Sequence, residues 1–136
     1  MTTDLKTLSR RAVACRHWRW MPGMLVIYPP SASAYLESAE GPFTGLKVRV
    51  VFRHNEQSSE PYEGTLPDLT DPATLGCLLA LVREAWGDEC ACVLPVDYGP
   101  GDVMWVCQLT AGGRSLTARH WPTEAEALVA ALEAAP

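Results

Sequence analysis

The sequence predicts a single α+β domain over residues 1–136, in which three helices pack on a mainly antiparallel, sandwich-like sheet of four or five strands. Three segments place apolar residues at helical spacing and carry capping residues at their ends. Other segments are rich in β-branched and aromatic residues, with glycine or proline between them, as strands and turns are. A chain of 136 residues has the length of one domain, which is about 100–150 residues.

The first part of the chain is predicted to hold a helix, a bent strand, a loop and a second strand. Apolar residues at steps of three and four predict a helix at 4–15. The segment WRWMPGMLVIY is interrupted by Pro-Gly, and it predicts two strand pieces or one bent strand. Residues 29–45 are rich in Pro, Ser, Ala and Gly, and they predict a long exposed loop. LKVRVVFR at 46–53 alternates apolar and basic residues, as a half-buried strand does.

The second helix is predicted at residues 72–86. Asp71 is a suitable N-cap, Pro72 suits the first helical position, and Gly87 suits the left-handed conformation that ends a helix. Apolar residues cover most of the circumference of this helix. We therefore expect it to be the most buried helix, either enclosed by its own fold or in contact with a second copy in a homodimer.

The last part of the chain is predicted to hold a short strand, a hairpin and the third helix. CACVLPV predicts a strand that ends in the loop DYGPGD. MWVCQLT and SLTARHW are predicted to pair antiparallel within 103–121, because the glycines of the turn at 111–114 tolerate positive φ. Thr123 and Glu126 form a capping box, so a helix is predicted to begin after Thr123.

Charge is unevenly distributed along the sequence. The chain has 11 Lys and Arg against 16 Asp and Glu, for a net charge of −5. The first twenty residues are basic, whereas ten acidic residues between Glu56 and Asp102 face the single base Arg83. This acidic segment predicts either a solvated face or a patch that docks on a basic partner. Nucleic-acid binding by the basic first helix is the least favoured alternative, because the whole chain is anionic.

Cysteine usage indicates a reducing compartment. The five cysteines are an odd number with no repeating spacing, which does not suit a disulfide framework. Structural zinc sites commonly separate paired ligands by two to four residues. That spacing is missing from the four residues considered as ligands, namely Cys15, His17, Cys90 and Cys92. No metal, cofactor or catalytic residue is therefore predicted. No apolar run reaches the ~18–20 residues of a membrane span, so we expect a soluble, unexported protein.

Two groups of residues are candidates for binding a partner. Trp18 and Trp20 are expected to share one face of a strand, with Arg19 on the other, and they serve either the core or a binding surface. The second group lies at the end of the predicted helix 72–86, within the acidic segment. The candidate binding residues are Trp18, Arg19, Trp20, Glu84, Asp88 and Glu89.

Three sequence blocks support a family resemblance. WRWMPGM, LPDLTDPATLGCLLALVREAWG and WVCQL…SLTARHWPTEAEALVAALEAA resemble small uncharacterised proteins encoded by tailed bacteriophages and prophages. The ending, a hairpin followed by an alanine-rich helix, is similar to the phage ABA sandwich domain, in which helices cover a sheet. The resemblance touches about half of the chain. It implies a phage accessory protein made in the cytoplasm of the bacterial host, and it carries over no functional residue.

These observations predict a non-enzymatic function. We expect protein–protein interaction with a host or anti-phage defence factor, through the acidic surface or the apolar margin of helix 72–86. The alternative is a small enzyme or ligand-binding protein whose site is assembled from Cys90, Cys92, His120 and carboxylates when the chain folds.

Overall fold

The computed structural model describes residues 4–27, 47–50, 64–110 and 119–136. It contains three helices and five short strands within these ranges. The predicted loop at 29–45 and the predicted turn at 111–114 lie outside the described residues. In chain order the elements are α1 (Leu5–Ala14), β1 (Leu25–Ile27), β2 (Lys47–Arg49), β3 (Leu66–Pro67), α2 (Pro72–Trp86), β4 (Cys92–Asp97), β5 (Val103–Gln108) and α3 (Glu124–Glu133).

The three helices begin and end where capping residues predict. The Asp4 carboxylate accepts from the backbone N–H of the third α1 residue, and Asp71 does the same for α2. Gly87 ends α2 with a φ of 63°, in the left-handed region that only glycine adopts cheaply. The Thr123 hydroxyl accepts from the Glu126 backbone N–H at 3.2 Å, as a capping box requires. The predicted helix boundaries are therefore confirmed to within a residue or two.

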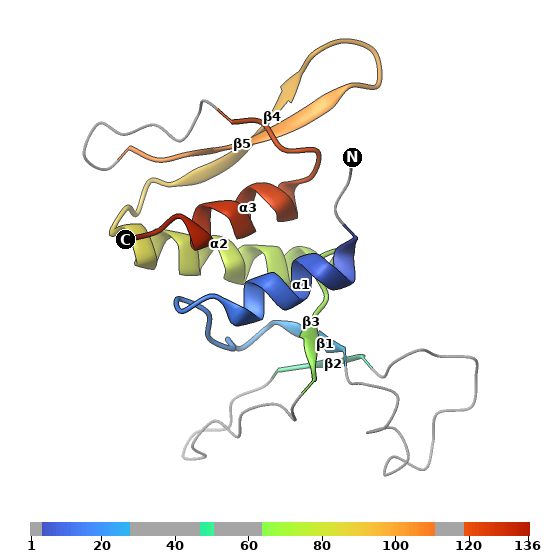
Figure 1. The fold of residues 1–136 in the computed structure, drawn as a ribbon, viewed down its shortest axis with the longest axis vertical. Helices are drawn as coiled ribbons and strands as arrows, with labels where there is room; N and C mark the ends of the chain where they lie inside the picture. Colours follow the sequence, from blue (N-terminus) through green and yellow to red (C-terminus); the bar gives the residue numbers. More distant parts are fainter. Residues whose placement is uncertain (1–3, 28–46, 51–63, 111–118) are drawn as a thin grey trace.

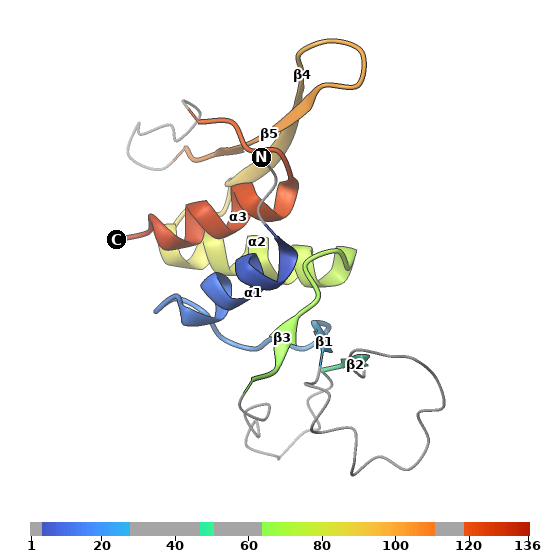
Figure 2. The same ribbon diagram turned by 45° about the vertical axis from the view of Figure 1, so that its right-hand side comes forward.

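The five strands form two small antiparallel sheets, so the prediction of one sheet of four or five strands is wrong. One sheet has the order β2-β1-β3, and the other consists of β4 and β5. Figures 1 and 2 show the helices between them, with the β4–β5 hairpin on one side and the three-stranded sheet on the other. The physical reason lies in the helices. A helix that is apolar around most of its circumference needs cover on two sides, and one sheet covers only one.

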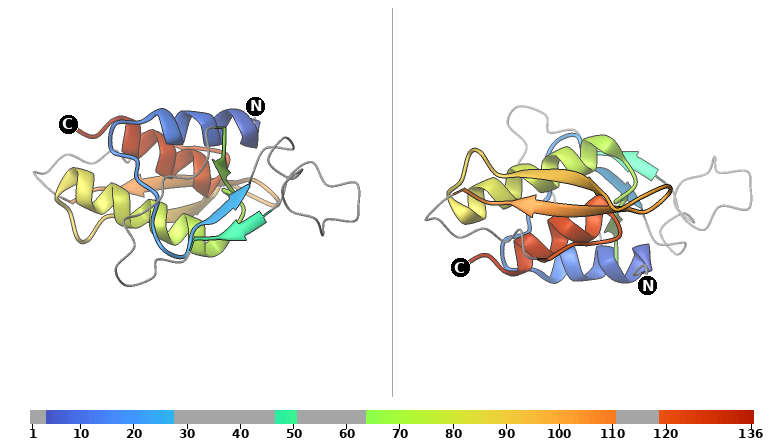
Figure 3. Two further views of the ribbon diagram at one scale, coloured as in Figure 1. Left: turned by 90° about the horizontal axis from the view of Figure 1, so that it is seen from below. Right: turned by 90° about the horizontal axis from the view of Figure 1, so that it is seen from above.

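The third helix, and not the second, is the most buried. Seven of the ten residues of α3 are buried, compared with four of the fifteen in α2. Seen from above in Figure 3, the β4–β5 hairpin lies over α2 and α3. Alanine occupies many α3 positions, which allows α1, α2 and the hairpin to approach it closely. The buried Leu78 of α2 and Leu128 of α3 belong to the single core cluster that these elements share.

The structure contains a hairpin that the sequence analysis did not predict. β4 and β5 pair from Cys92 opposite Gln108 to Asp97 opposite Val103, and residues 98–102 connect them. The predicted pairing within 103–121 is seen among the described residues where Trp105 and Trp121 exchange backbone hydrogen bonds of 2.7 and 2.8 Å, and its remaining part, at 111–118, lies outside them. The DYGPGD segment, predicted to be a loop, is the turn that joins β4 to β5.

Candidate functional site

The fold neutralises the charge segregation of the sequence. Four ion pairs join basic residues from positions 11–49 to acidic residues from positions 68–133. They are Arg11 with Glu133, Arg19 with Glu84, Lys47 with Asp68, and Arg49 with Asp71. Much of the acidic segment is therefore occupied by contacts within the chain. Of its described acidic residues, Glu89, Asp97 and Asp102 have exposed side chains and form no ion pair with the described residues.

Asp68 and Asp71, two of the acidic residues in ion pairs, anchor the three-stranded sheet. Burial opposes the ionisation of Asp68, but hydrogen bonds from Lys47 and Thr70 outweigh it, so the pKa of Asp68 lies below its ordinary value. The hydrogen bonds from the Arg49 guanidinium lower the pKa of Asp71 to about 2. Both carboxylates are therefore charged at neutral pH and hold β2, at the edge of its sheet, next to the start of α2.

The predicted Trp18, Arg19 and Trp20 lie together, but their backbone is not a strand. The two indole rings meet edge to face, with centroids 5.3 Å apart, and both pack against the core cluster. The Arg19 side chain is exposed and forms its ion pair with Glu84 of α2. The tryptophans therefore contribute to packing, and Arg19 lies at the surface beside the end of α2.

The predicted acidic residues at the end of α2 divide into two kinds. Glu84 and Glu89 are exposed and help to line an open pocket of about 480 Å³ beside the Arg19 side chain. Asp88 is 5% exposed. Its carboxylate accepts from the Thr110 backbone N–H at 2.6 Å, the Thr110 hydroxyl at 2.9 Å and the Cys90 backbone N–H at 3.0 Å. These contacts give Asp88 a part in folding, at the junction of α2, β4 and the end of β5.

The cysteines and histidines considered for chemistry do not form a cluster. Among the described residues there is no group of three or more His, Cys, Asp or Glu able to hold a metal ion. Cys90 is exposed, whereas the Cys92 thiol lies near Gln108. His120 is exposed, and its ring contacts the Tyr98 hydroxyl at the hairpin turn. Within the described part of the chain, Cys90, Cys92 and His120 therefore belong to no such metal-binding group.

The β4–β5 hairpin carries most of the large apolar side chains that the described surface exposes. Four such residues are more than 40% exposed, and three of them are on this hairpin: Leu94 at 43%, Tyr98 at 53% and Val103 at 46%. The fourth is Leu5 of α1, at 45%. In Figure 2 the end of the hairpin extends beyond the helices.

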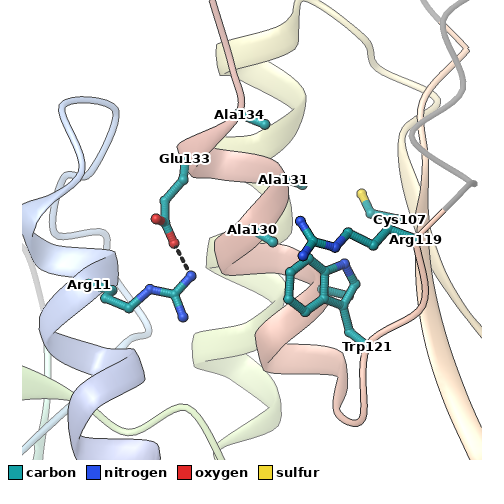
Figure 4. A pocket seen from close by; sticks show the side chains of 9 residues that line it. Arg11, Cys107, Arg119, Trp121, Ala130, Ala131, Glu133 and Ala134 are labelled. Carbon is teal, nitrogen blue, oxygen red and sulfur yellow. Dashed lines mark hydrogen bonds and ion pairs between the residues drawn. The ribbon is translucent and has the colours of Figure 1, made fainter. Parts of the chain in front are cut away.

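A second feature that the sequence analysis missed is a pocket on the surface of α3, here called the Arg119 pocket. It has a volume of about 360 Å³, and Figure 4 shows Arg11 of α1 on one side of α3 and Arg119 and Trp121 on the other. The Arg119 guanidinium lies 4.9 Å from the centre of the Trp121 ring. The other lining residues are Cys107, Ala127, Ala130, Ala131, Glu133 and Ala134. Arg119 and Trp121 are two residues apart in the predicted strand SLTARHW, which is the one signal for this pocket in the sequence.

Within the described residues, no helix is long and apolar enough to cross a membrane. Comparison of the chain with protein-family models, with curated proteins and with solved structures gave no match.

Proposed function

We propose that this protein acts by protein–protein contact and that the β4–β5 hairpin is its contact surface. The observation that supports the proposal is the concentration of exposed Leu94, Tyr98 and Val103 on one projecting element. Exposed apolar side chains that gather on one element favour an interface, whereas scattered ones need no explanation. We favour the hairpin over the predicted margin of helix 72–86, because Leu78 and Leu81 of α2 are buried within the chain and its other two leucines are partly buried.

The face of the hairpin that points away from the helices is apolar. Val93 and Cys107 are opposite each other and pack toward the core cluster, so the alternate pairs lie on the outer face. Leu94 opposite Val106 and Val96 opposite Met104 are two such pairs. Tyr98 follows on the same face, since it is four residues after Leu94. Val106 is buried, so the part of this face that is open to an apolar side chain of a partner lies at the exposed Leu94 and Tyr98.

The outer edge of β4 is unsuited to pairing with another strand. Trp105 directs its backbone N–H and C=O to Trp121, so Pro95, which is opposite Trp105, directs its backbone away from β5. Proline has no N–H, and the middle of this edge therefore lacks the donor that an added strand would need. The partner is expected to pack on the side chains of the hairpin and not to extend its sheet.

The charges at the hairpin turn specify the chemistry of the partner. Asp97 and Asp102 flank the turn, both are exposed, and neither forms an ion pair with the described residues. We expect a protein surface with an apolar centre and basic residues at its border. The resemblance to phage and prophage proteins supports a host or anti-phage defence factor in the bacterial cytoplasm as that partner.

Site-specific photo-crosslinking in bacterial cells tests this proposal. A photoreactive phenylalanine analogue replaces Tyr98 in one variant and Leu5 in a matched control, because both side chains are about half exposed. We expect a discrete adduct with another protein from position 98 and none from position 5. Adding Leu94→Asp should remove the adduct, and Asp97→Asn with Asp102→Asn should weaken it. Circular dichroism should show unchanged folding, since Leu94 is at the surface.

Three results would overturn the hairpin as a hetero-partner surface. They are the same adducts from positions 98 and 5, an adduct that survives Leu94→Asp, and an adduct only with a second copy of the chain. The last would favour a homodimer formed by the hairpin. The predicted homodimer through helix 72–86 is a separate proposal, which sedimentation of a Leu75→Asp variant tests, because Leu75 is only partly buried on that helix.

A further inference from the structure

The Arg119 pocket has space that the packing of α3 leaves open. Four alanines line it at steps of three, one and three residues, on the side of α3 between α1 and Trp121. A methyl group is too short to fill the gap that the side chains of Arg11 and Trp121 frame. The resulting volume of about 360 Å³ is within the ~300–1,000 Å³ of small-molecule sites. The pocket is thus large enough for a compound of one or two rings.

The charges around the pocket leave one positive group available. Arg11 is bound to Glu133 at 2.5 Å, so these two cancel. Arg119 forms no ion pair with the described residues, and its guanidinium is positioned by stacking on the Trp121 ring. The chain as a whole has a charge of −5. Other described basic residues, such as Arg10, also form no ion pair, but Arg119 is the one of them that lines this pocket, where it favours an anionic ligand.

We propose that the Arg119 pocket binds a small, flat aromatic monocarboxylate. The guanidinium of Arg119 donates two parallel hydrogen bonds to the carboxylate, which is the geometry that arginine favours. The ring of the ligand lies on the alanines of α3 and beside the indole of Trp121, where it buries apolar surface. Because Arg11 and Glu133 neutralise each other, Arg119 supplies the one net positive charge of the lining, and a monoanion matches it better than a phosphate dianion.

The remaining polar group in the lining supports the same assignment. Burial raises the pKa of the Cys107 thiol to about 11, so this side chain is neutral at physiological pH. It adds no negative charge that would compete with the ligand for Arg119. The floor around it, formed by the buried Ala127 and Ala131, is apolar. The pocket therefore combines one fixed cation with an uncharged apolar floor.

Isothermal titration calorimetry with matched probes tests the proposal on the full chain. The probes are 2-naphthoate, its neutral counterpart 2-naphthamide, and inorganic phosphate. We expect naphthoate to bind about tenfold or more tightly than naphthamide, because it gains charge-assisted hydrogen bonds from Arg119. Arg119→Gln should remove this preference. Arg10→Gln is the control, since it deletes the same charge from an exposed α1 residue outside the pocket. Ala130→Leu should weaken both aromatic probes by filling the space.

Four outcomes would overturn the proposal. Naphthoate and naphthamide of equal affinity would show that no cation takes part. Phosphate that binds as tightly as naphthoate would show an anion site with no apolar requirement. Retained naphthoate preference in Arg119→Gln, or unchanged affinity in Ala130→Leu, would place binding elsewhere. Thermal unfolding of each variant without probe separates a loss of affinity from a loss of fold. Because Arg119 is exposed and Ala130 is only partly buried, we expect both variants to fold.

Discussion

The Arg49 guanidinium donates two hydrogen bonds to the carboxylate of Asp71, at 3.0 and 3.1 Å. The same carboxylate caps α2 by accepting from the Thr74 backbone N–H at 2.9 Å. One side chain therefore links strand β2, which is at the edge of its sheet, to the start of the second helix. This link fixes the three-stranded sheet on the helical layer, and it makes Asp71 a residue whose protonation affects two elements at once.

Acid should weaken this link. Because the Arg49 hydrogen bonds hold the pKa of Asp71 at about 2, below the ~3.9 of an unfolded aspartate, the folded state loses stability as pH falls from about 4 to about 2. Asp71→Asn keeps a good N-cap but lacks the charge. We expect wild type to be the more stable at pH 7 and the difference to shrink over this window. Urea unfolding at several pH values measures it, and a constant difference would contradict the prediction.

The Thr74 hydroxyl joins the same helix to β1. It donates to Asp71 at 2.9 Å and accepts from the Leu25 backbone N–H at 2.8 Å, and Thr74 itself is fully buried. Thr74→Val keeps the shape but leaves that N–H without an acceptor, which should cost about 1–3 kcal/mol. Thr74→Ser keeps the hydroxyl and should cost less. Equal losses of unfolding free energy in the two variants would show that packing, and not the hydrogen bond, is what matters.

Asp88 should matter for folding, although the sequence made it a candidate for binding. Asp88→Ala removes an acceptor of three hydrogen bonds and leaves the Thr110 and Cys90 donors unpartnered, at a cost of about 2–3 kcal/mol. Glu89→Ala, at the next, exposed position, should change stability by at most about 0.5 kcal/mol. The midpoint of urea unfolding checks both. An Asp88→Ala variant as stable as Glu89→Ala would contradict the role of Asp88 in folding.

Local signals predicted the helices, because caps act on adjacent residues. Asp71, Pro72 and Gly87 fix the ends of α2 through contacts within a few residues, and the sequence displays all of them. The grouping of strands into sheets depends on contacts distant in sequence. The glycines at 111–114 and the turn DYGPGD are both suitable hairpin turns, and the sequence alone does not rank them. The sequence therefore predicted the segments that form β4 and β5 but not that these two strands pair with each other.

The candidate site was harder to predict, because the sequence gives the order of the charged residues along the chain but not the distances between their side chains in the folded structure. The acidic segment looked unpartnered because its bases, such as Arg19 and Arg49, are distant in sequence. The pair of Arg19 with Glu84 was within the predicted residues, but only the fold places α2 beside that arginine. Exposure of Leu94 and Tyr98 is likewise a property of the fold, because it depends on which parts of the hairpin the helices leave uncovered.

The thiols should differ in reactivity in a way that reports on the core. Cys107 is buried and its pKa is raised to about 11, two units above an ordinary 9.0, so its thiolate fraction below pH 9 is about a hundredfold lower. Cys90 is exposed. We expect iodoacetamide at pH 8 to alkylate Cys90 first and Cys107 only at the rate of opening, as followed by peptide mass spectrometry. In concentrated urea the difference should vanish. Rapid native alkylation of Cys107 would mean that the packing of β5 on α3 is looser than the structure describes.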